Sequence, residues 1–350
     1  MAQTSDGPLY LRQASFTVQV QGAADVTAGA PPDFGWSLIP PAGSLRGVPS
    51  RKYDGLHIRF KVEMHLQNAP NTLELVIYNL ARTTRGQLQA PNAYVTLRAG
   101  YAKDGPYPPV VFQGNSRTIE HARVGPDWET RIQCGDGESA YRFSVCNQSW
   151  GPGVSASVIA TYLAQQIAKG DVDPVTGNSR IDIRPFLARV AIPFPQPGSL
   201  AYPLQVFVFG FALQGNAFEE LARFLGIGYT LSIQNGQLLA LAAFEGTRLS
   251  VPLLSPGTGL LDSPDHGAPN FTSAPPLLKV RCLLDPRIAA GDFIQIKSQN
   301  QAGLFRVSSA NHTGDLGGND WFTTMECSPV SSPKLASGAP LVVPIPAGRV

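Results

Sequence analysis

The strongest pattern in the sequence is the run LHIRFKVEMHLQ, residues 56–67, in which apolar and polar side chains alternate without exception. Such alternation is typical of a long β-strand with one buried and one solvent-facing side. The turn residues 68–71 lead into TLELVIYN, residues 72–79, so the two runs predict a large β-hairpin. We also predict one short helix near 83–89, and shorter strands at 94–99, 110–114, 128–134 and 141–146.

Between residues 151 and 246 the spacing of apolar residues becomes helical. The segment 153–170 carries an apolar stripe and ends in a glycine, which predicts a helix. A Pro-rich stretch without periodicity, 174–203, leads to a second predicted helix. Asn216 has the character of its N-cap, and Glu219 has the spacing of a capping-box partner.

The dipeptide Asn235-Gly236 predicts a two-residue turn within a β-hairpin at 230–241. From about residue 247 the chain is β-like again, with predicted strands at 277–284, 292–297, 303–308 and 321–327. We therefore predict a mainly β fold with a smaller α+β part. Its segments are a first β domain (1–150), an α+β connecting domain (151–246), a second β domain (247–332) and an extended Pro-rich C-terminal arm (333–350).

Composition agrees with this prediction. Gly (35) and Pro (31) are abundant without a collagen-like period, which favours many turns between short strands. The net charge of +2 lacks the basic excess of a protein that binds nucleic acid tightly. We see neither a signal peptide nor an apolar run that could span a bilayer as a helix. We therefore expect assembly in a cytoplasm, no membrane span, and four reduced cysteines.

A ten-residue phrase occurs twice: GPDWETRIQC at 125–134 returns as GNDWFTTMEC at 318–327. An ungapped comparison also places a phenylalanine sixteen residues before the tryptophan in both copies. A strand-like run precedes each, at 94–97 and at 293–296, so the pattern predicts one β unit written twice. The residues that we assign to the core and turn of this unit are Phe112, Asp127, Trp128 and Cys134, and Phe305, Asp320, Trp321 and Cys327.

The repeat could instead be a duplicated chemical site, because His312 and Asp315 lie near the second phrase. The ungapped comparison, however, places His121 opposite Gly314 rather than opposite His312. A duplicated site should keep its ligands in register, so we interpret the repeat as structural. Its Gly and Asp residues would shape a hairpin turn, while its Trp and Cys residues would be buried in the core.

Other polar groups have the composition of chemical sites without the expected context. The polar side of the 56–67 strand holds potential metal ligands, but it also carries basic residues that oppose a cation. Two carboxylate pairs resemble those of glycosidases but lie in Gly-rich turns, where Asp bonds to the backbone. We therefore expect no enzymatic activity, no cofactor and no metal. These residues are His57, Glu63 and His65 on the strand, and Asp136, Glu138, Asp171 and Asp173 in the turns.

Taken together, the segments resemble the baseplate hub (central tail hub) proteins of long-tailed bacteriophages, most closely those with contractile tails. The resemblance covers most of residues 10–330 and is weakest over the first fifty residues, over 174–203 and over the C-terminal arm. The runs that carry it are LHIRFKVEM and PNTLELVIYNL (56–80), VTLRAGY (95–101), VFQGNSRTIEH and GPDWETRIQCGDGE (111–138), IQNGQLL (233–239), LSPGTGLLDSP (254–264), VRCLLDPRIAAGDFIQI (280–296) and FRVSSANHTGDLGGNDWFTTMEC (305–327).

The resemblance implies two tail-tube-like β-barrel domains, joined by a small α+β domain, in a chain that assembles as a ring-shaped homotrimer. Six similar β units around one axis would match a sixfold tail tube protein on one face and a trimeric spike protein on the other. Baseplate wedge proteins are further implied partners, DNA would only pass through the lumen, and the location would be the virion tail baseplate. Two alternatives remain open: a tail-tip cell-wall glycan hydrolase that uses carboxylates such as Asp136 or Asp171, and the equivalent hub of a contractile injection or secretion system.

Overall fold

The structure is a computed structural model of the chain. It describes residues 12–19, 26–29, 56–88, 93–101, 108–174, 176–190, 207–226, 228–242, 245–247, 251–262, 264–266, 277–330 and 334–335. Most of the predicted C-terminal arm and part of the Pro-rich stretch 174–203 lie outside these residues.

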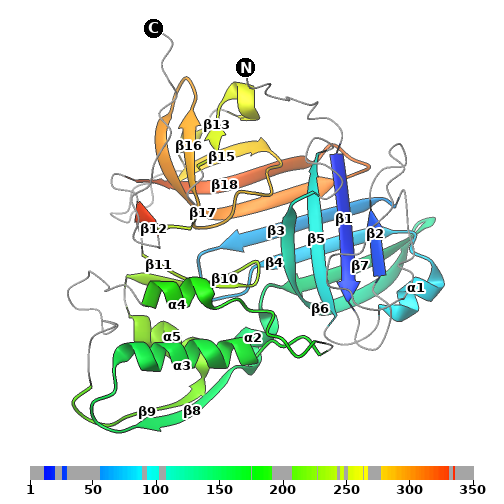
Figure 1. Cartoon of the computed structure of the whole chain (residues 1–350). Coiled ribbons are helices and arrows are strands. Elements are labelled where there is room, and N and C mark those ends of the chain that lie inside the picture. The colour runs from blue at the N-terminus through cyan, green and yellow to red at the C-terminus, as the bar shows by residue number, and fades with distance from the viewer. Residues whose placement is uncertain are drawn as a thin grey trace, which may run out of the picture.

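One sheet of thirteen strands joins the beginning of the chain to its end (Figure 1). Its strand order is β14-β15-β18-β17-β3-β4-β7-β6-β5-β1-β2, with β16 paired to β17 and β13 paired to β16. The strands are β1 (Arg12–Gln19), β2 (Val26–Gly29), β3 (Ile58–His65), β4 (Thr72–Tyr78), β5 (Tyr94–Tyr101), β6 (Val110–Val124), β7 (Asp127–Gly135), β13 (Leu253–Leu254), β14 (Asp265–His266), β15 (Leu278–Leu283), β16 (Phe293–Lys297), β17 (Ala302–Asp315) and β18 (Trp321–Pro329).

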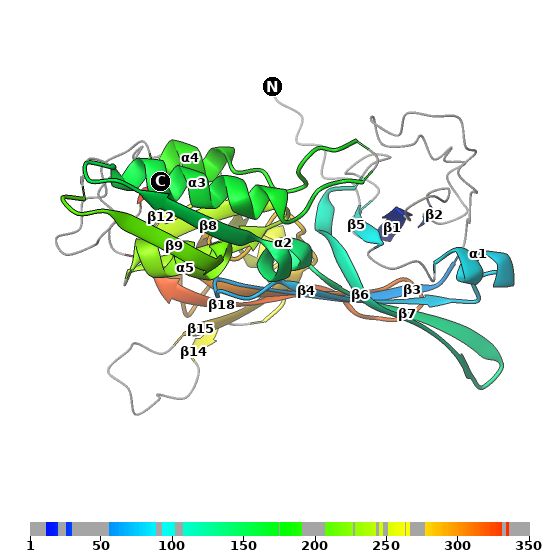
Figure 2. The same cartoon turned by 90° about the horizontal axis from the view of Figure 1, so that it is seen from below.

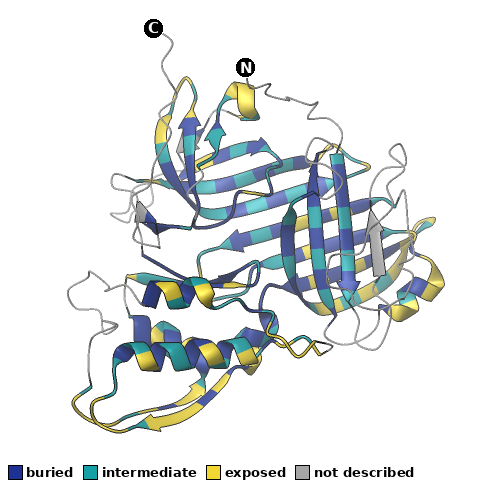
Figure 3. Cartoon of the chain, in the orientation of Figure 1, coloured by how far each residue is buried: buried dark blue, intermediate teal, exposed yellow. Residues whose placement is uncertain are grey.

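The predicted alternation of β3 is confirmed. Ile58, Phe60, Val62 and Met64 are at most 1% exposed, while Arg59 and Lys61 between them are exposed. The other long strands show the same stripes of buried and exposed residues (Figure 3). The buried faces of β1, β3–β7 and β15–β18 form a single hydrophobic core, so the first and last parts of the chain share one interior.

The segment between these parts forms a smaller α+β unit with its own hydrophobic core. Helices α3 and α5 pack together there, above the two-stranded sheet β8-β9 in Figure 1. Its elements are α2 (Glu138–Phe143), β8 (Val145–Trp150), α3 (Ala156–Lys169), α4 (Arg184–Val190), β9 (Phe211–Asn216), α5 (Ala217–Leu225), β10 (Tyr229–Gln234) and β11 (Gln237–Ala242). The remaining elements are α1 (Arg82–Gln87), β12 (Glu245–Gly246), β19 (Lys334–Leu335) and a 3-10 turn, Pro256–Thr258.

Local signals located the α+β unit well. The Asn216 side chain accepts hydrogen bonds from the backbone N–H groups of Phe218 and Glu219, as expected for an N-cap. Asn235 and Gly236 have φ of 48° and 74°, the positive values that a type I′ hairpin turn needs. The chain is thus mainly β with a smaller α+β part, as predicted, and the division into domains stays a prediction.

Three element predictions were wrong. Residues 141–146 are not one strand, because Gly137 turns the chain at a φ of 64° into the short helix α2, and β8 follows it. Helix α4 lies within the stretch predicted to lack periodicity. Strands β6 and β17 continue far beyond the predicted 110–114 and 303–308. In β17 the inward positions 312 and 314 are held by His312 and Gly314, so the sequence does not show the alternation of apolar and polar residues there.

Candidate assembly surface

The repeated phrase marks two β units with the same strand order. Repeat 1 (residues 58–135) has the order β3-β4-β7-β6-β5, and repeat 2 (residues 265–329) has the order β14-β15-β18-β17-β16. Cys134 in β7 lies between Leu73 and Ser116, and Cys327 in β18 lies between Leu278 and Val307. A β-bulge follows at the same place in both hairpins, immediately after Ser116 and Val307.

The two histidines are in register, which corrects the ungapped comparison. His121 pairs across the hairpin with Thr130, and His312 pairs with Thr323. In each pair the imidazole Nδ1 and the threonine Oγ1 are hydrogen-bonded, at 3.0 and 2.9 Å. The turn at 316–319 is longer than the turn at 125–126, so an alignment without a gap shifts everything upstream of it. For the same reason Phe112 and Phe305 are not equivalent. Phe112 pairs with Leu97 and Phe305 pairs with Ile294, and these two pairs differ by two residues in their position along the repeat.

The burial of these residues indicates a packing role. Burial lowers the pKa of His121, and it lowers the pKa of the fully buried His312 to about 4. Cys134 and Cys327 are buried, and burial raises the pKa of both thiols far above neutral pH. Protonated thiols in a hydrophobic core are poor nucleophiles and poor metal ligands, and each imidazole has its Nδ1 atom engaged by a threonine hydroxyl.

The two tryptophans differ, and the prediction that both are buried was wrong for Trp128. Trp321 is 3% exposed and contacts Phe60 of β3 edge-to-face at 5.7 Å between ring centroids. Trp128 is 39% exposed, with the Arg85 guanidinium 3.8 Å from its ring centroid. The difference follows from the neighbouring strand: β3 lies against repeat 2 near Trp321, whereas the β6–β7 hairpin of repeat 1 projects past β3 and β4 (Figure 2).

The two aspartates of the repeated phrase lie at the ends of the two hairpin turns. The Asp127 carboxylate accepts a hydrogen bond from the Asn79 amide at 2.9 Å, and the Asn79 side chain also accepts the Trp128 N–H. The Asp320 backbone carbonyl accepts the Asp315 N–H across the second turn. Side chains hold the turn of repeat 2 as well, since the Asp315 carboxylate accepts the Gly317 N–H and the Arg12 guanidinium donates to the Gly318 carbonyl.

One face of the large sheet is polar and carries charges of both signs. Cross-strand neighbours alternate in sign, as in the pairs Lys61–Glu74, Arg59–Asp315 and Lys279–Glu326. Lys61 also forms an ion pair with Glu63 at 2.6 Å. Such a face is hydrated and charge-balanced, and it offers no basic stripe for DNA phosphates. Its residues include Thr118, Glu120, Arg131, Gln133, Glu74, Arg59, Lys61, Glu63, Asn311, Thr313, Asp315, Thr324, Glu326, Lys279 and Arg281.

The potential metal ligands on β3 are separated in the structure. The His57 Nε2 atom lies 2.5 Å from an Asp315 carboxylate oxygen, and its ring stacks on Tyr78. Glu63 is paired with Lys61 instead. Within the described residues, no group of three or more His, Cys, Asp or Glu side chains could hold a metal ion.

The structure does bring Asp136 and Asp171 together, but inside the protein. Asp136 is 1% exposed and accepts hydrogen bonds from the N–H groups of Asn235 and Gly236, at the β10–β11 turn. Asp171 is 2% exposed, accepts a hydrogen bond from Asn115 and lies 3.7 Å from the Arg180 guanidinium. The carboxylates thus connect the sheet to the α+β unit, and no substrate could reach them.

Further polar contacts surround this pair. The Asn71 amide donates to the Ile233 carbonyl and to Gln234 at 3.2 and 2.8 Å, and Gln113 donates to the Asn235 carbonyl at 2.6 Å. Burial raises the pKa of Asp136 to about 7, against the opposing effect of the two N–H donors. Burial also raises the pKa of Asp171, and Arg180 opposes that shift. We name this set of residues the carboxylate junction.

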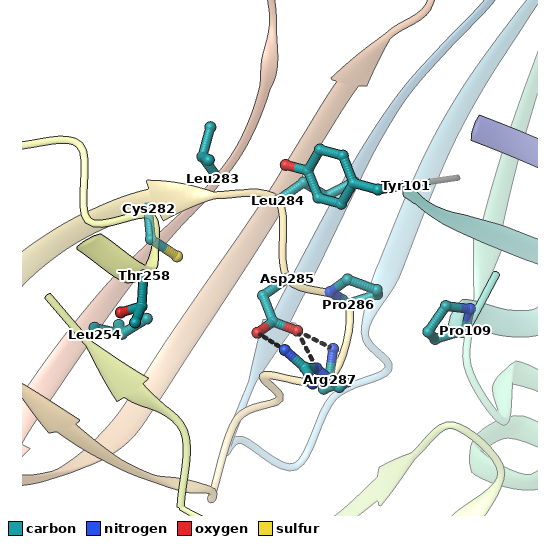
Figure 4. A pocket seen from close by; sticks show the side chains of 10 residues that line it. All are labelled: Tyr101, Pro109, Leu254, Thr258, Cys282, Leu283, Leu284, Asp285, Pro286 and Arg287. Carbon is teal, nitrogen blue, oxygen red and sulfur yellow. Dashed lines mark hydrogen bonds and ion pairs between the residues drawn. The ribbon is translucent and has the colours of Figure 1, made fainter. Parts of the chain in front are cut away.

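Two hollows among the described residues contain no paired carboxylates. A cavity of about 60 Å³ lies between the end of β5 and the residues that follow β15 (Figure 4). Tyr101, Cys282 and Leu284 line it, together with Asp285, whose carboxylate is paired with Arg287. A second, open hollow of about 400 Å³ between β8 and α3 is lined by uncharged residues, among them Trp150 and Tyr162. The first has room for only a few waters, and the residues that line the second include no carboxylate.

Comparison with solved structures identifies the fold. The 43 kDa tail protein of prophage MuSo2 from Shewanella oneidensis matches with a TM-score of 0.53 at 10% identity, over 94% of this chain and 99% of that chain. The chain shares its fold with phage tail proteins. A tail protein from Neisseria meningitidis MC58 matches with a TM-score of 0.51 at 10% identity, over 91% of this chain and 97% of that one.

A secretion component has the same fold. It is an E. coli protein of the type VI secretion system that is structurally similar to the T4 bacteriophage tail proteins gp27 and gp5. It matches with a TM-score of 0.52 at 10% identity, over 87% of this chain and 81% of that chain. Neither a protein-family model nor a curated protein sequence matches the chain. Among the described residues, no helix is both long and apolar enough to cross a membrane.

Proposed function

We propose that this protein is a structural baseplate hub, in which three chains form a ring of six similar β units. The observation that supports this most strongly is the duplication of one β unit, down to its bulge and its His–Thr pair, within a fold shared with phage tail proteins. A chain with two similar units allows a trimer to present near-sixfold symmetry. Each unit would be a tail-tube-like β domain, with the α+β unit between them.

Such a ring would join a hexameric tail tube protein on one face to a trimeric spike protein on the other. Baseplate wedge proteins would contact its periphery. The charge-balanced face of the large sheet would line the lumen, because DNA must pass there without being held. The ring would act in the virion tail baseplate after assembly in the host cytoplasm, and it would have no enzymatic activity. The same architecture fits the hub of a contractile injection or secretion system, for which one solved structure provides a precedent of fold.

Light scattering of the purified protein, followed by electron microscopy, tests the ring. One chain has a mass of 37.3 kDa, so three chains give 3 × 37.3, or about 112 kDa. We expect this mass at high protein concentration, and images of rings with a central hole. A monomer at every concentration, together with intact particles that contain no ring of this protein, would refute the proposal. Hydrolysis of peptidoglycan that is lost in Asp136→Asn would instead favour a glycan hydrolase.

A further inference from the structure

Strand β6 has a sheet edge that the rest of the described chain leaves open. Its first part, residues 110–115, pairs with β5, and its opposite edge pairs with β7 over 115–124. The Ser116 N–H still donates to the Ala93 carbonyl, and beyond residue 116 no described strand pairs with the β5-facing edge. An unpaired edge exposes a row of N–H and C=O groups, which favours pairing with another strand.

Repeat 2 shows what covers the equivalent edge. Strand β17 pairs with β16 over its first residues, and over residues 309–315 the same edge pairs with β3 of repeat 1. The positional equivalent of β3 in repeat 2 is β14, because β14 lies beside β15 as β3 lies beside β4. Strand β14 pairs with β15, and among the described strands nothing pairs with its other edge. The described strands therefore form one covered junction and leave the two halves of an equivalent junction open.

The two tryptophans differ in burial in the same way as the two strand edges differ in pairing. Trp321 is buried where β3 covers repeat 2, through contact with Phe60. Trp128, at the equivalent position of repeat 1, is 39% exposed. A large aromatic side chain that faces the core side of a sheet but remains exposed is typical of a surface that becomes buried on association.

We propose that β14 of a second chain pairs with the open edge of β6, repeating between chains the β3–β17 pairing within the chain. This inference rests on the proposed ring and states which edges close it. The occupant is a second copy of this protein, because the internal repeat supplies the matching strand. Around a trimer, three junctions within chains would alternate with three junctions between chains, and no edge of this kind would remain open.

The repeat also fixes the register. Within the chain, Thr313 of β17 pairs with Lys61 of β3. We align the two repeats by matching Cys134 with Cys327. In this alignment Ala122 is equivalent to Thr313, and Asp265 is equivalent to Lys61. We therefore expect Ala122 of one chain to lie opposite Asp265 of the next. Cα atoms of directly opposed residues in antiparallel strands lie about 4.5–5.5 Å apart, which suits a disulfide.

Disulfide trapping tests this register. The double variant Ala122→Cys/Asp265→Cys of the full chain should form covalent dimers and trimers under mild oxidation, seen on a non-reducing gel and reversed by reductant. The matched control Thr313→Cys/Lys61→Cys should form its bond within one chain and give no covalent oligomer. Each single variant should give no trimer. The native cysteines are all buried, so they add little background.

The outcomes separate this inference from the proposed function. A trimer by light scattering without the Ala122–Asp265 disulfide, while the control pair does form its bond, would leave the ring intact and refute the proposed edges. A monomer at all concentrations would refute both. Oxidative footprinting of the unmodified protein provides a second measurement, because Trp128 should become protected on assembly while Trp321 stays protected throughout. Equal labelling of Trp128 before and after trimer formation would also contradict the proposed pairing.

Discussion

Replacing Asp136 by asparagine should change how the free energy of unfolding of the protein depends on pH. Asp136 lies in the carboxylate junction and receives two backbone N–H groups of the β10–β11 turn. The nearby Asp171 also raises the pKa of Asp136, and Asp136 in turn raises the pKa of Tyr94 and of Tyr141. Arg180 lies beside Asp171. Asparagine has nearly the same shape but cannot ionise, so the change isolates the charge.

The magnitude follows from the pKa. Burial raises the pKa of Asp136 from 3.8 to about 7. A difference of about three pKa units corresponds to ~4 kcal/mol between the two protonation states. The folded protein therefore binds a proton that the unfolded chain releases between about pH 4 and pH 7, so this group lowers the free energy of unfolding as pH rises through that range. Below pH 4 the effect is absent, and above pH 7 it is complete.

We expect the stability of Asp136→Asn relative to the wild type to increase by about 4 kcal/mol from pH 4 to pH 8. At low pH the variant should be less stable than the wild type. The asparagine NH₂ group cannot accept a hydrogen bond, so one of the two backbone N–H groups would lose its acceptor, at a cost of about 1–3 kcal/mol. At high pH this cost is offset, because the wild type carries a buried carboxylate. The two stability curves should therefore cross.

Urea unfolding, followed by circular dichroism at several pH values, measures the total effect. Hydrogen exchange of the Asn235 and Gly236 amides reports opening of the junction itself. The comparison with the wild type is essential, because His312 has a lowered pKa and acts in the opposite direction, stabilising the fold as pH rises from about 4 to 6.5. A stability difference that stays constant from pH 4 to pH 8 would show that Asp136 is ionised throughout, and the reasoning would be wrong.

Three further predictions concern packing. Gly314→Ala should destabilise the fold by about 1–3 kcal/mol in thermal or urea unfolding, because its Cβ would clash with the Phe60 ring. The matched change Gly86→Ala in helix α1 meets nothing within 4 Å and should be neutral or stabilising. Trp321→Ala should cost about 3–5 kcal/mol and Trp128→Ala much less in the unassembled protein; equal losses would contradict the difference in burial. Asn216→Ala should cost about 1 kcal/mol by removing the α5 cap, measured against Asn147→Ala on the exposed side of β8, and no loss would argue against the cap.

Local signals in the sequence were sufficient for most elements. The alternation in β3, the cap at Asn216 and the Asn235-Gly236 turn each depend on neighbouring residues, and each was predicted correctly. The repeat was detectable because tryptophan and cysteine are rare in the chain. Its alignment failed at the turn, since the extra residues at 316–319 cannot be located without knowing which residues pair across the hairpin.

The long-range features could not be read from the sequence. The β3–β17 pairing joins residues about 250 positions apart, and neither strand carries a local mark of its partner. Asp136 and Asp171 were noted as carboxylates, but their burial depends on the packing of the β10–β11 turn against the sheet. A Gly-rich turn looks the same in sequence whether it faces solvent or another part of the fold.

The pairing of β3 with β17 has a consequence for how the protein folds during synthesis. Asp315 is synthesised long after Arg59. The edge of β3 that pairs with β17 therefore stays unpaired while the intervening chain is made. The α+β unit can fold in that interval, because all its buried core residues lie between Ala140 and Ala240 and are made before β17. We therefore expect completion of the large sheet to be the slow step of folding. The unpaired edge of β3 should be the part of the nascent chain most prone to aggregate.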